Sequence, residues 1–326
     1  MNLTSPSQVK SWCIENGFHP NKTLGQNFLI DRNALLAIVD AGLETAMAMD
    51  GGNPPKPPEG VCRVLEIGPG LGVLTEELLK RGCRVTAIEK DPELAQRLEQ
   101  LVDESPNRRT DESTKEPCWR NLEVIEGDAL EVIAAEDSRK GLKGPKGPKG
   151  QTLDLLQPTN RRIDESTNRR IDEFSCMISN LPYQAGTRIL LELVQRRAVP
   201  SMTVLVQTEV AERLAAKEGS KMRGLAGVWT QLDYDVKIVR KVAASCFWPR
   251  PEIGSTVVRL DRHDRNLDLD AEERKTFYRL TKRAFEHRRK QLGSTFKDMI
   301  QSTARAEELS NEDWKLLARS LKGAIG

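Results

Sequence analysis

The chain has 326 residues, enough for two domains of ordinary size, and its hydrophobic content of 38% is sufficient for their cores. Lys and Arg number 50 against 48 Asp and Glu, so overall charge excludes a strongly basic RNA-binding protein, and any nucleic-acid affinity must come from local clusters. The 6 cysteines form no C-x-x-C pair, and no apolar run approaches the ~18 residues of a membrane span. We therefore expect a cytoplasmic protein with no metal site, no disulfide framework and no membrane partner.

Strand and helix patterns alternate along the chain. The run 61–68 predicts a strand and 75–82 a helix, after which come a strand at 83–91, a helix at 92–104 and a strand at 122–129. The pattern resumes with a strand at 174–180, a helix at 188–197, a strand at 202–207 and a helix at 208–218. This alternation predicts an α/β fold with a parallel, Rossmann-like sheet, whose ligands bind at the carboxyl ends of the strands. From about residue 270 the chain is helical and charged, so we predict a larger domain at 1–265 and a small helical domain at 266–326.

Three segments do not fit a compact fold and are interpreted as disordered insertions, at about 51–60, 104–118 and 137–173. They contain Pro and Gly runs and a repeated NRR-DEST octapeptide. A basic repeat could be an RNA-binding arm, but each copy has nearly as many acids as bases and no aromatic residue. We therefore expect functionally silent loops. Each leads into the beginning of a strand, at the edge of the sheet opposite the ligand crevice.

Candidate ligand-binding groups follow the first three predicted strands. The motif EIGPGLG, 66–72, allows close approach of the backbone to a ligand, but Val73 stands where a dinucleotide fingerprint needs a third glycine. Glu89 ends the second strand, where a carboxylate can accept both hydroxyls of a ribose. Asp128 ends the third strand, where a carboxylate can accept a hydrogen bond from an adenine amino group. Each acid alone could be a solvated strand end, but together they favour an adenosyl ligand.

The fourth predicted strand ends in SNLPYQAGT, 179–187. The amide oxygen of Asn180 and a backbone carbonyl beside Pro182 are hydrogen-bond acceptors, and Tyr183 offers a flat face. Such a group could hold an exocyclic amino group by both hydrogens and aim the nitrogen lone pair at an electrophile, without a general base. A turn of purely structural use is the alternative for this tetrapeptide.

Read together, the motifs of this sequence resemble the ribosomal RNA adenine N6,N6-dimethyltransferases, especially the branch that acts on small-subunit RNA. The resemblance rests on LGQNFLID (24–31), EIGPGLG (66–72), GDA (127–129), NLPY (180–183), QTEVAERLAAKEGSK (207–221), FWPRPEIGSTVVRL (247–260) and AFEHRRKQL (284–292). It departs from the family pattern after NLPY, where Arg188 stands at a position at which proline is common. The repeat insertions have no family counterpart.

The resemblance implies a class I S-adenosylmethionine-dependent methyltransferase domain and assigns roles to individual residues. The implied S-adenosylmethionine site comprises Asn27, Leu29, Glu66, Gly68, Gly70, Glu89, Asp128 and Asn180. A flipped adenine would be held by Asn180, Leu181, Pro182, Tyr183 and Phe247. The clustering of basic residues, independently of the resemblance, predicts contacts to RNA phosphates from the second domain and the loop after the fifth strand, unless these residues form an ordinary solvated surface. The residues are Lys217, Lys221, Arg223, Arg279, Lys282, Arg283, Arg288, Arg289 and Lys290.

By this resemblance the expected reaction is dimethylation at N6 of two adjacent adenosines near the 3′ end of 16S rRNA, by a monomer acting on the assembling small subunit. A large-subunit (23S) adenine methyltransferase is the alternative within the fold. A ribosome-assembly factor without turnover is an alternative of a different class. A nicotinamide oxidoreductase is disfavoured by Val73 and by the absence of a hydride-transfer acid.

Overall fold

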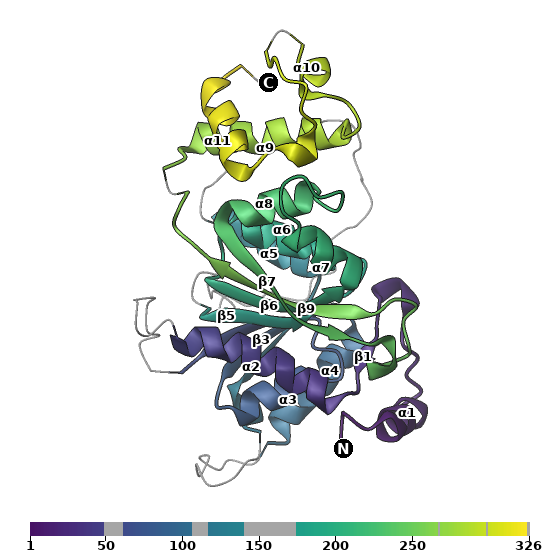
Figure 1. Ribbon diagram of the computed structural model, residues 1–326. Coiled ribbons are helices and arrows are strands. Elements are labelled where there is room, and N and C mark those ends of the chain that lie inside the picture. Colours follow the sequence, from purple (N-terminus) through teal and green to yellow (C-terminus); the bar gives the residue numbers. More distant parts are fainter. Residues whose placement is uncertain (49–60, 106–116, 140–173, 267, 298, 325–326) are drawn as a thin grey trace, which may run out of the picture.

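The chain forms a layered α/β body with a helical cap at one end (Figure 1). The computed structural model describes residues 1–48, 61–105, 117–139, 174–266, 268–297 and 299–324. The predicted insertions lie almost entirely outside these residues. The helix α5, Ala129–Arg139, runs past residue 137, where the third insertion was expected to begin.

A seven-stranded sheet forms the centre, in the order β4-β3-β2-β5-β6-β9-β7. The strands from β4 to β6 are parallel, and β9 and β7 are added antiparallel at one edge. The parallel strands are β2 (Arg63–Ile67), β3 (Arg84–Glu89), β4 (Leu122–Glu126), β5 (Cys176–Asn180) and β6 (Ser201–Gln207). All were predicted from their apolar runs, and the α/β class is confirmed.

Helices cover both faces of the sheet. One face packs against α2 (Arg32–Ala48), α3 (Val73–Lys80) and α4 (Pro92–Asp103). The other packs against α5, α6 (Gly186–Gln195) and α7 (Thr208–Ala215), with α8 (Leu225–Asp233) beyond them (Figure 1). The order in which the strands are added to the sheet reverses at β2, which has β3 on one side and β5 on the other. A crevice for ligands is expected at this point of a doubly wound sheet.

Sequence reasoning missed the elements that do not follow the strand and helix alternation. They include the antiparallel pair β7 (Tyr234–Val242) and β9 (Ser255–Arg262), with the 3₁₀ turn η6 (Ala244–Cys246) between them. A two-stranded sheet joins β1 (Phe28–Leu29) to β8 (Phe247–Trp248) and so ties the N-terminal segment to the loop before β9. The remaining N-terminal and connecting elements are α1 (Pro6–Glu15) and the 3₁₀ turns η1 (Lys22–Leu24) and η3 (Trp119–Asn121).

The C-terminal part is helical, as expected. It comprises α9 (Ala271–Glu286), α10 (Leu292–Thr295), η7 (Ala306–Glu308) and α11 (Asn311–Ser320). Asp270 begins α9 with a capping box, in which its carboxylate accepts backbone N–H groups and Glu273 bonds back to the Asp270 N–H. The apolar core of these helices includes Val228 and Leu232 of α8. The helical part is therefore packed against α8 by a shared core.

No described helix combines the length and the apolar composition needed to cross a membrane.

Candidate active site

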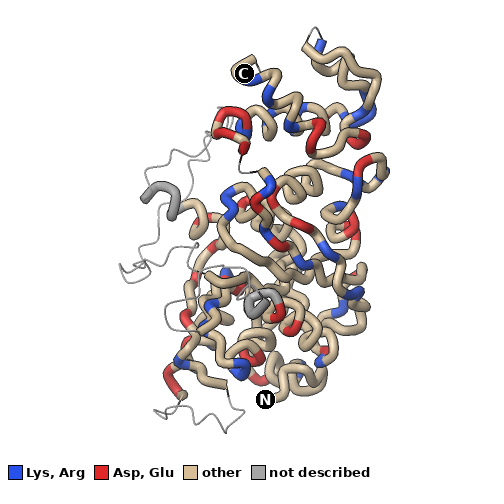
Figure 2. The backbone as a smooth tube through the Cα atoms, turned by 60° about the vertical axis from the view of Figure 1, so that its left-hand side comes forward, with Lys and Arg blue, Asp and Glu red and all other residues tan. Residues whose placement is uncertain are grey.

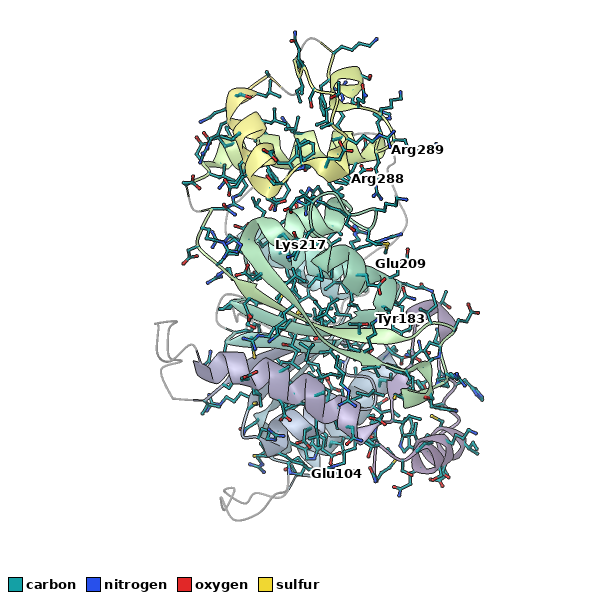
Figure 3. All side chains as sticks on the ribbon, viewed as in Figure 1. Glu104, Tyr183, Glu209, Lys217, Arg288 and Arg289 are labelled. Carbon is teal, nitrogen blue, oxygen red and sulfur yellow. The ribbon has the colours of Figure 1, made fainter. Side chains whose placement is uncertain are left out.

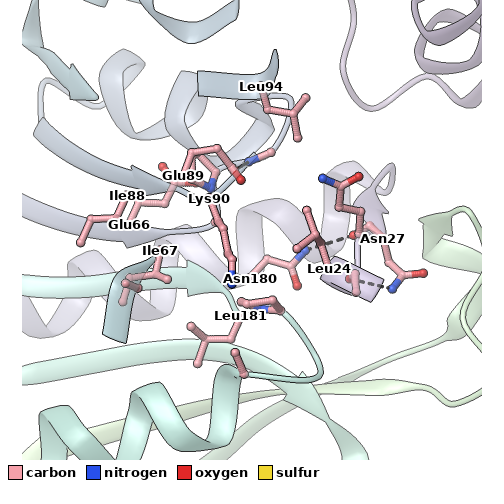
Figure 4. A pocket seen from close by; sticks show the side chains of 18 of the residues that line it. Leu24, Asn27, Glu66, Ile67, Ile88, Glu89, Lys90, Leu94, Asn180 and Leu181 are labelled. Carbon is pink, nitrogen blue, oxygen red and sulfur yellow. Dashed lines mark hydrogen bonds between the residues drawn. The ribbon is translucent and has the colours of Figure 1, made fainter. Parts of the chain in front are cut away.

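A cavity of about 190 Å³ lies at the carboxyl ends of β2, β3 and β5. The acidic strand ends and the Asn-Leu-Pro-Tyr turn predicted from the sequence line it together (Figure 4). The predicted residues in its wall are Asn27, Leu29, Glu66, Gly68, Gly70, Glu89, Asp128, Asn180, Leu181, Pro182 and Tyr183.

The glycine turn after β2 forms one wall of the cavity. Gly68 and Gly70 have φ angles of +68° and +59°, in the left-handed region that side chains rarely adopt. A Cβ at Gly70 would lie 3.2 Å from the ring of Phe28. The Gly70 N–H donates to Glu89 Oε2 at 3.0 Å. The turn therefore needs glycine for both its conformation and its packing, and it holds the carboxylate of the next strand.

Glu89 is almost fully buried at the end of β3. Its two carboxylate oxygens accept backbone N–H groups, from Asp91 to Oε1 at 2.9 Å and from Gly70 to Oε2 at 3.0 Å. Burial raises the pKa of Glu89, and these hydrogen bonds offset only part of that rise. The carboxyl is held in one orientation by the backbone and retains lone pairs for hydroxyl donors.

Glu66 lies beneath the cavity and is 1% exposed. Thr75 Oγ1 donates to Glu66 Oε2 at 2.7 Å. Burial raises the pKa of Glu66 to about 8, with a smaller contribution from the nearby Glu89. At neutral pH this side chain is therefore largely a neutral acid.

Asp128 follows β4 at the side of the cavity. Lys90 Nζ lies 2.8 Å from Asp128 Oδ2, and the Leu130 N–H donates to Oδ1 at 2.8 Å. Burial alone would raise the pKa of Asp128, but the hydrogen bonds from Lys90 and Leu130 lower it below its ordinary value. The cavity thus contains an ionised carboxylate at Asp128 and a largely protonated one at Glu66.

The Asn180 amide is fixed by the segment across the cavity. Its Nδ2 donates to the backbone carbonyl of Asn27 at 3.3 Å, as the dashed line in Figure 4 shows. Because the nitrogen is used in this contact, the amide presents its oxygen, Oδ1, as an acceptor. Sequence reasoning anticipated the acceptor but not the group that orients it.

The turn after Asn180 is anchored at both ends. The Pro182 carbonyl accepts the Gly186 N–H at 2.7 Å, which joins the turn to α6. Tyr183 Oη lies 2.6 Å from Ser255 Oγ, at the start of β9. Burial raises the pKa of Tyr183, so its hydroxyl stays protonated at physiological pH. The Tyr183 ring is half-buried in the wall of the cavity and is fixed by the Ser255 contact.

Phe247, the predicted stacking residue, is buried and does not line the cavity. Its side chain is 2% exposed and packs in the apolar layer with Leu29 and Val257, outside the lining of the cavity. The sequence could not show this burial. A base can stack on Phe247 only after the covering residues move, so this role stays a prediction.

The cavity combines a glycine turn, buried carboxyls and an oriented amide at the carboxyl ends of the parallel strands. A family model described as ribosomal RNA adenine dimethylase matches residues 17–316. The chain belongs to the ribosomal RNA adenine dimethylase family.

Relatives of this dimethylase named ribosomal RNA small subunit methyltransferase A cover most of the chain. That of Deinococcus radiodurans is 36% identical over 259 residues, 79% of this chain and 67% of the relative. That of Rhodococcus erythropolis is 32% identical over 312 residues, 94% of this chain and 84% of the relative.

Two solved structures share the fold of this dimethylase. A dimethyladenosine transferase from Plasmodium falciparum has a TM-score of 0.58 at 20% identity, covering 90% of this chain and 98% of that one. The 23S rRNA methyltransferase ErmE has a TM-score of 0.54 at 20% identity, covering 90% of this chain and 99% of that one. At this identity they support the fold alone.

The N-terminal segment that contains the predicted residues Asn27 and Leu29 closes one side of the site of this dimethylase. Residues 23–29 all line the cavity. Gln26 Nε2 donates to Asp91 Oδ2 at 2.7 Å, and Gln26 Oε1 accepts the Asn21 N–H at 2.7 Å. Asp91 is also the N-cap of α4 and donates its N–H to Glu89. Gln26 therefore connects the segment that holds Asn180 to the turn that holds Glu89.

The predicted RNA-binding residue Arg223 is corrected by the structure. Its side chain is 1% exposed. The guanidinium donates to the Ala216 carbonyl, to Gln231 Oε1 and, at 2.8 Å, to Asn311 Oδ1 of α11. An arginine enclosed in this way cannot reach a phosphate, and it instead joins the loop after α7 to the C-terminal helices.

The other predicted RNA-binding residues lie at or near the surface of the dimethylase. In Figure 3 Arg288 and Arg289 lie by the C-terminal helices, and Tyr183 lies below them on the sheet. Arg288 donates to the Lys221 carbonyl and lies 3.5 Å from Glu307. Lys217, Lys221, Arg279, Lys282, Arg283, Arg289 and Lys290 are exposed. Basic and acidic residues are otherwise interspersed along the chain (Figure 2), consistent with the net charge of +2.

Across the described ranges no group of three or more His, Cys, Asp or Glu side chains could hold a metal ion.

Proposed function

We propose that this dimethylase transfers methyl groups from S-adenosylmethionine to N6 of two adjacent adenosines near the 3′ end of 16S rRNA, two to each base. The observation that carries the proposal is the orientation of the Asn180 amide. Its nitrogen donates to the Asn27 carbonyl, so its oxygen is available as a hydrogen-bond acceptor for a ligand in the cavity. The partner is the 16S rRNA of an assembling small subunit, in the cytoplasm. Relatives named for small-subunit RNA support this choice of substrate.

The residues of the cavity fit S-adenosylmethionine. Glu89, anchored by two backbone N–H groups, can accept both ribose hydroxyls, and Asp128 can accept the adenine amino group. The glycine turn lets the backbone approach the ligand, and Glu66 would lie near the amino-acid end. When bound, S-adenosylmethionine supplies a methyl group on a positively charged sulfur.

The chain's own contribution to the reaction is positional. Asn180 Oδ1 and the backbone carbonyl of Leu181 can accept the two hydrogens of the target amine, while Tyr183 supports the ring. Drawing both hydrogens towards oxygen atoms reduces delocalisation of the nitrogen lone pair into the purine. The amine is neutral before attack and loses its proton after methylation, so no basic side chain is needed to activate it.

The experiment supplies small subunits that lack the modification together with labelled S-adenosylmethionine and maps the labelled nucleotides. We expect label on N6 of two neighbouring adenosines of 16S rRNA. Label on 23S rRNA would select the alternative within the fold, and label on guanine, cytosine or protein would contradict the mechanism. Absence of label with intact subunit binding would indicate an assembly factor without turnover.

The substitution Asn180→Ala tests the role of the amide. It removes an acceptor that acts on the reacting amine, so we expect kcat to fall about 10²-fold or more. S-adenosylmethionine affinity, measured by calorimetry, should change much less, because Glu89 and Asp128 remain. Asn33→Ala, at an exposed asparagine of α2, is the control and should leave kcat unchanged. An Asn180→Ala protein with full activity would contradict the proposed geometry.

A further inference from the structure

The edge strand β7 contains a stretch that the fold leaves uncovered. The residues from Lys237 to Lys241, in the sequence KIVRK, are all exposed, although β7 is paired with β9 along its length. Ile238 is 40% and Val239 37% exposed. The register shifts between Ile238 and Arg240, so Val239 forms a bulge. We call residues 237–241 the β7 ribbon.

The β7 ribbon is cationic. Lys237, Arg240 and Lys241 are its charged residues, and none of its residues is acidic. Lys241 Nζ lies 3.7 Å from Glu212 of α7, and both side chains remain largely exposed, so this pair neutralises the ribbon only weakly. Arg240 donates to the backbone carbonyl of Asn33, which leaves its charge uncompensated by that contact. The ribbon therefore presents positive charge at the edge of the sheet on both faces, with Arg240 on the side of α2 and Lys241 on the side of α7.

The β7 ribbon ends beside the turn formed by residues 180–183, which we call the catalytic turn. Lys241 pairs with Thr256 and Val242 with Ser255, the residue whose hydroxyl contacts Tyr183. At its other end β7 begins directly after α8, which shares its core with the C-terminal helices. The strand therefore crosses the molecule between the C-terminal helices and the target-base site (Figure 1).

We propose that the β7 ribbon binds the phosphate backbone of the RNA strand that carries the target base. This inference rests on the proposed function, which brings an RNA strand to Tyr183. Lysine on an edge strand also prevents unwanted strand pairing, but that purpose does not explain an exposed Ile and Val beside the cations. A sheet edge with cations on both of its faces, and an exposed Ile and Val between them, can follow an RNA backbone by contacting its phosphates and sugars.

The test replaces the three cations by neutral side chains, in the triple variant Lys237→Gln, Arg240→Gln, Lys241→Gln. Binding to unmodified 16S rRNA and to unmodified small subunits is measured without S-adenosylmethionine over a range of salt concentrations. We expect the variant to bind both about tenfold or more weakly, with a salt slope reduced by about 2 to 3. S-adenosylmethionine affinity should stay unchanged, because these residues do not line the cavity, and it reports that the variant is folded.

A matched control removes the same charge elsewhere, with Lys80→Gln, Arg120→Gln and Lys275→Gln. These exposed cations lie at the end of α3, just before β4 and in the first turns of α9, away from the catalytic turn. Equal losses in the two triple variants would contradict the proposal, because only overall charge would then matter. Unchanged RNA binding in the ribbon variant would also overturn it. If the ribbon variant bound small subunits more weakly but bound protein-free rRNA normally, the proposal would be overturned, and the ribbon would instead contact a ribosomal protein.

Binding is measured apart from methyl transfer, so the outcome is separable from that of the proposed function. If the parent protein binds 16S rRNA but does not methylate it, the proposed reaction fails while the ribbon test remains decisive. If methylation occurs and the ribbon variant binds normally, only the ribbon proposal fails.

Discussion

Glu66 is a carboxylic acid enclosed at the end of β2, and its burial has a measurable consequence. Its pKa is raised to about 8 in the folded protein, against 4.5 for an exposed glutamate. The folded state therefore holds a proton between these pH values that the unfolded state has lost. The stabilisation is fully present below pH 4.5 and is lost as the pH rises through 8.

We predict that Glu66→Gln makes the protein less sensitive to alkaline pH. The glutamine can still accept the Thr75 hydroxyl, but it has no proton to lose. The free energy of unfolding of the variant minus that of the parent should rise by about 1 kcal/mol per pH unit between pH 5 and pH 8. Urea denaturation at several pH values measures this difference, in which titration of Glu89 and other shared groups largely cancels. Parallel pH profiles for the two proteins would show that Glu66 titrates normally.

At this scale the sequence predicted residues that stand where a strand ends. Asn180, Glu89 and Asp128 each follow an apolar run, and the parallel sheet brings all three to one cavity. Phe247 and Arg223 were placed by motif and by charge, and neither property reveals burial. The sequence does not distinguish a buried arginine with amide and carbonyl partners, such as Arg223, from an exposed one, so only the fold could separate them.

The N-terminal segment 21–29 acts at the scale of an element, because it closes the cavity and orients Asn180. We predict that Gln26→Ala weakens S-adenosylmethionine binding by about 5- to 150-fold, from the loss of two hydrogen bonds of about 0.5–1.5 kcal/mol each. The turnover number should also fall, since the Asn27 carbonyl that holds the Asn180 amide is no longer fixed. Calorimetry and steady-state kinetics measure the two effects.

Gln96→Ala is the matched control for this segment. Gln96 is exposed on α4, the helix that Asp91 caps, so its loss should leave both quantities unchanged. A Gln26→Ala protein with normal affinity and normal turnover would show that the segment is held by its apolar contacts alone.

The strands that could be predicted are those whose residue pattern does not depend on their position in the sheet. The parallel strands are covered on both faces, so they read as apolar runs that any chain of this class displays. The strand β7 carries charges and exposed apolar residues in turn because it lies at an edge. Its sequence therefore lacks a clear signal, and the partner strand β9 was missed with it.

For the whole molecule, the position of the site relative to the insertions follows from the parallel sheet. Described residues that flank the predicted insertions lead into Arg63, Leu122 and Cys176, the first residues of β2, β4 and β5. The acceptor Asn180 is at the far end of β5, about 13 Å from Cys176 at ~3.3 Å per residue.

We therefore predict that replacing residues 143–173 by a short Gly and Ser linker leaves catalysis intact. The described residues on either side are the end of α5 and the start of β5, and β5 begins at the edge of the sheet opposite the cavity. We therefore expect the carboxylates and the Asn180 turn to keep the contacts described above. The values of kcat and KM for unmodified small subunits should agree with those of the parent within about twofold, and S-adenosylmethionine affinity should be unchanged. A large rise in KM with normal S-adenosylmethionine affinity would instead assign these residues to RNA binding, since the chemistry and the cofactor site would both be unaffected. A fall in kcat with unchanged KM would show that the replaced residues act on the chemical step and would contradict the prediction.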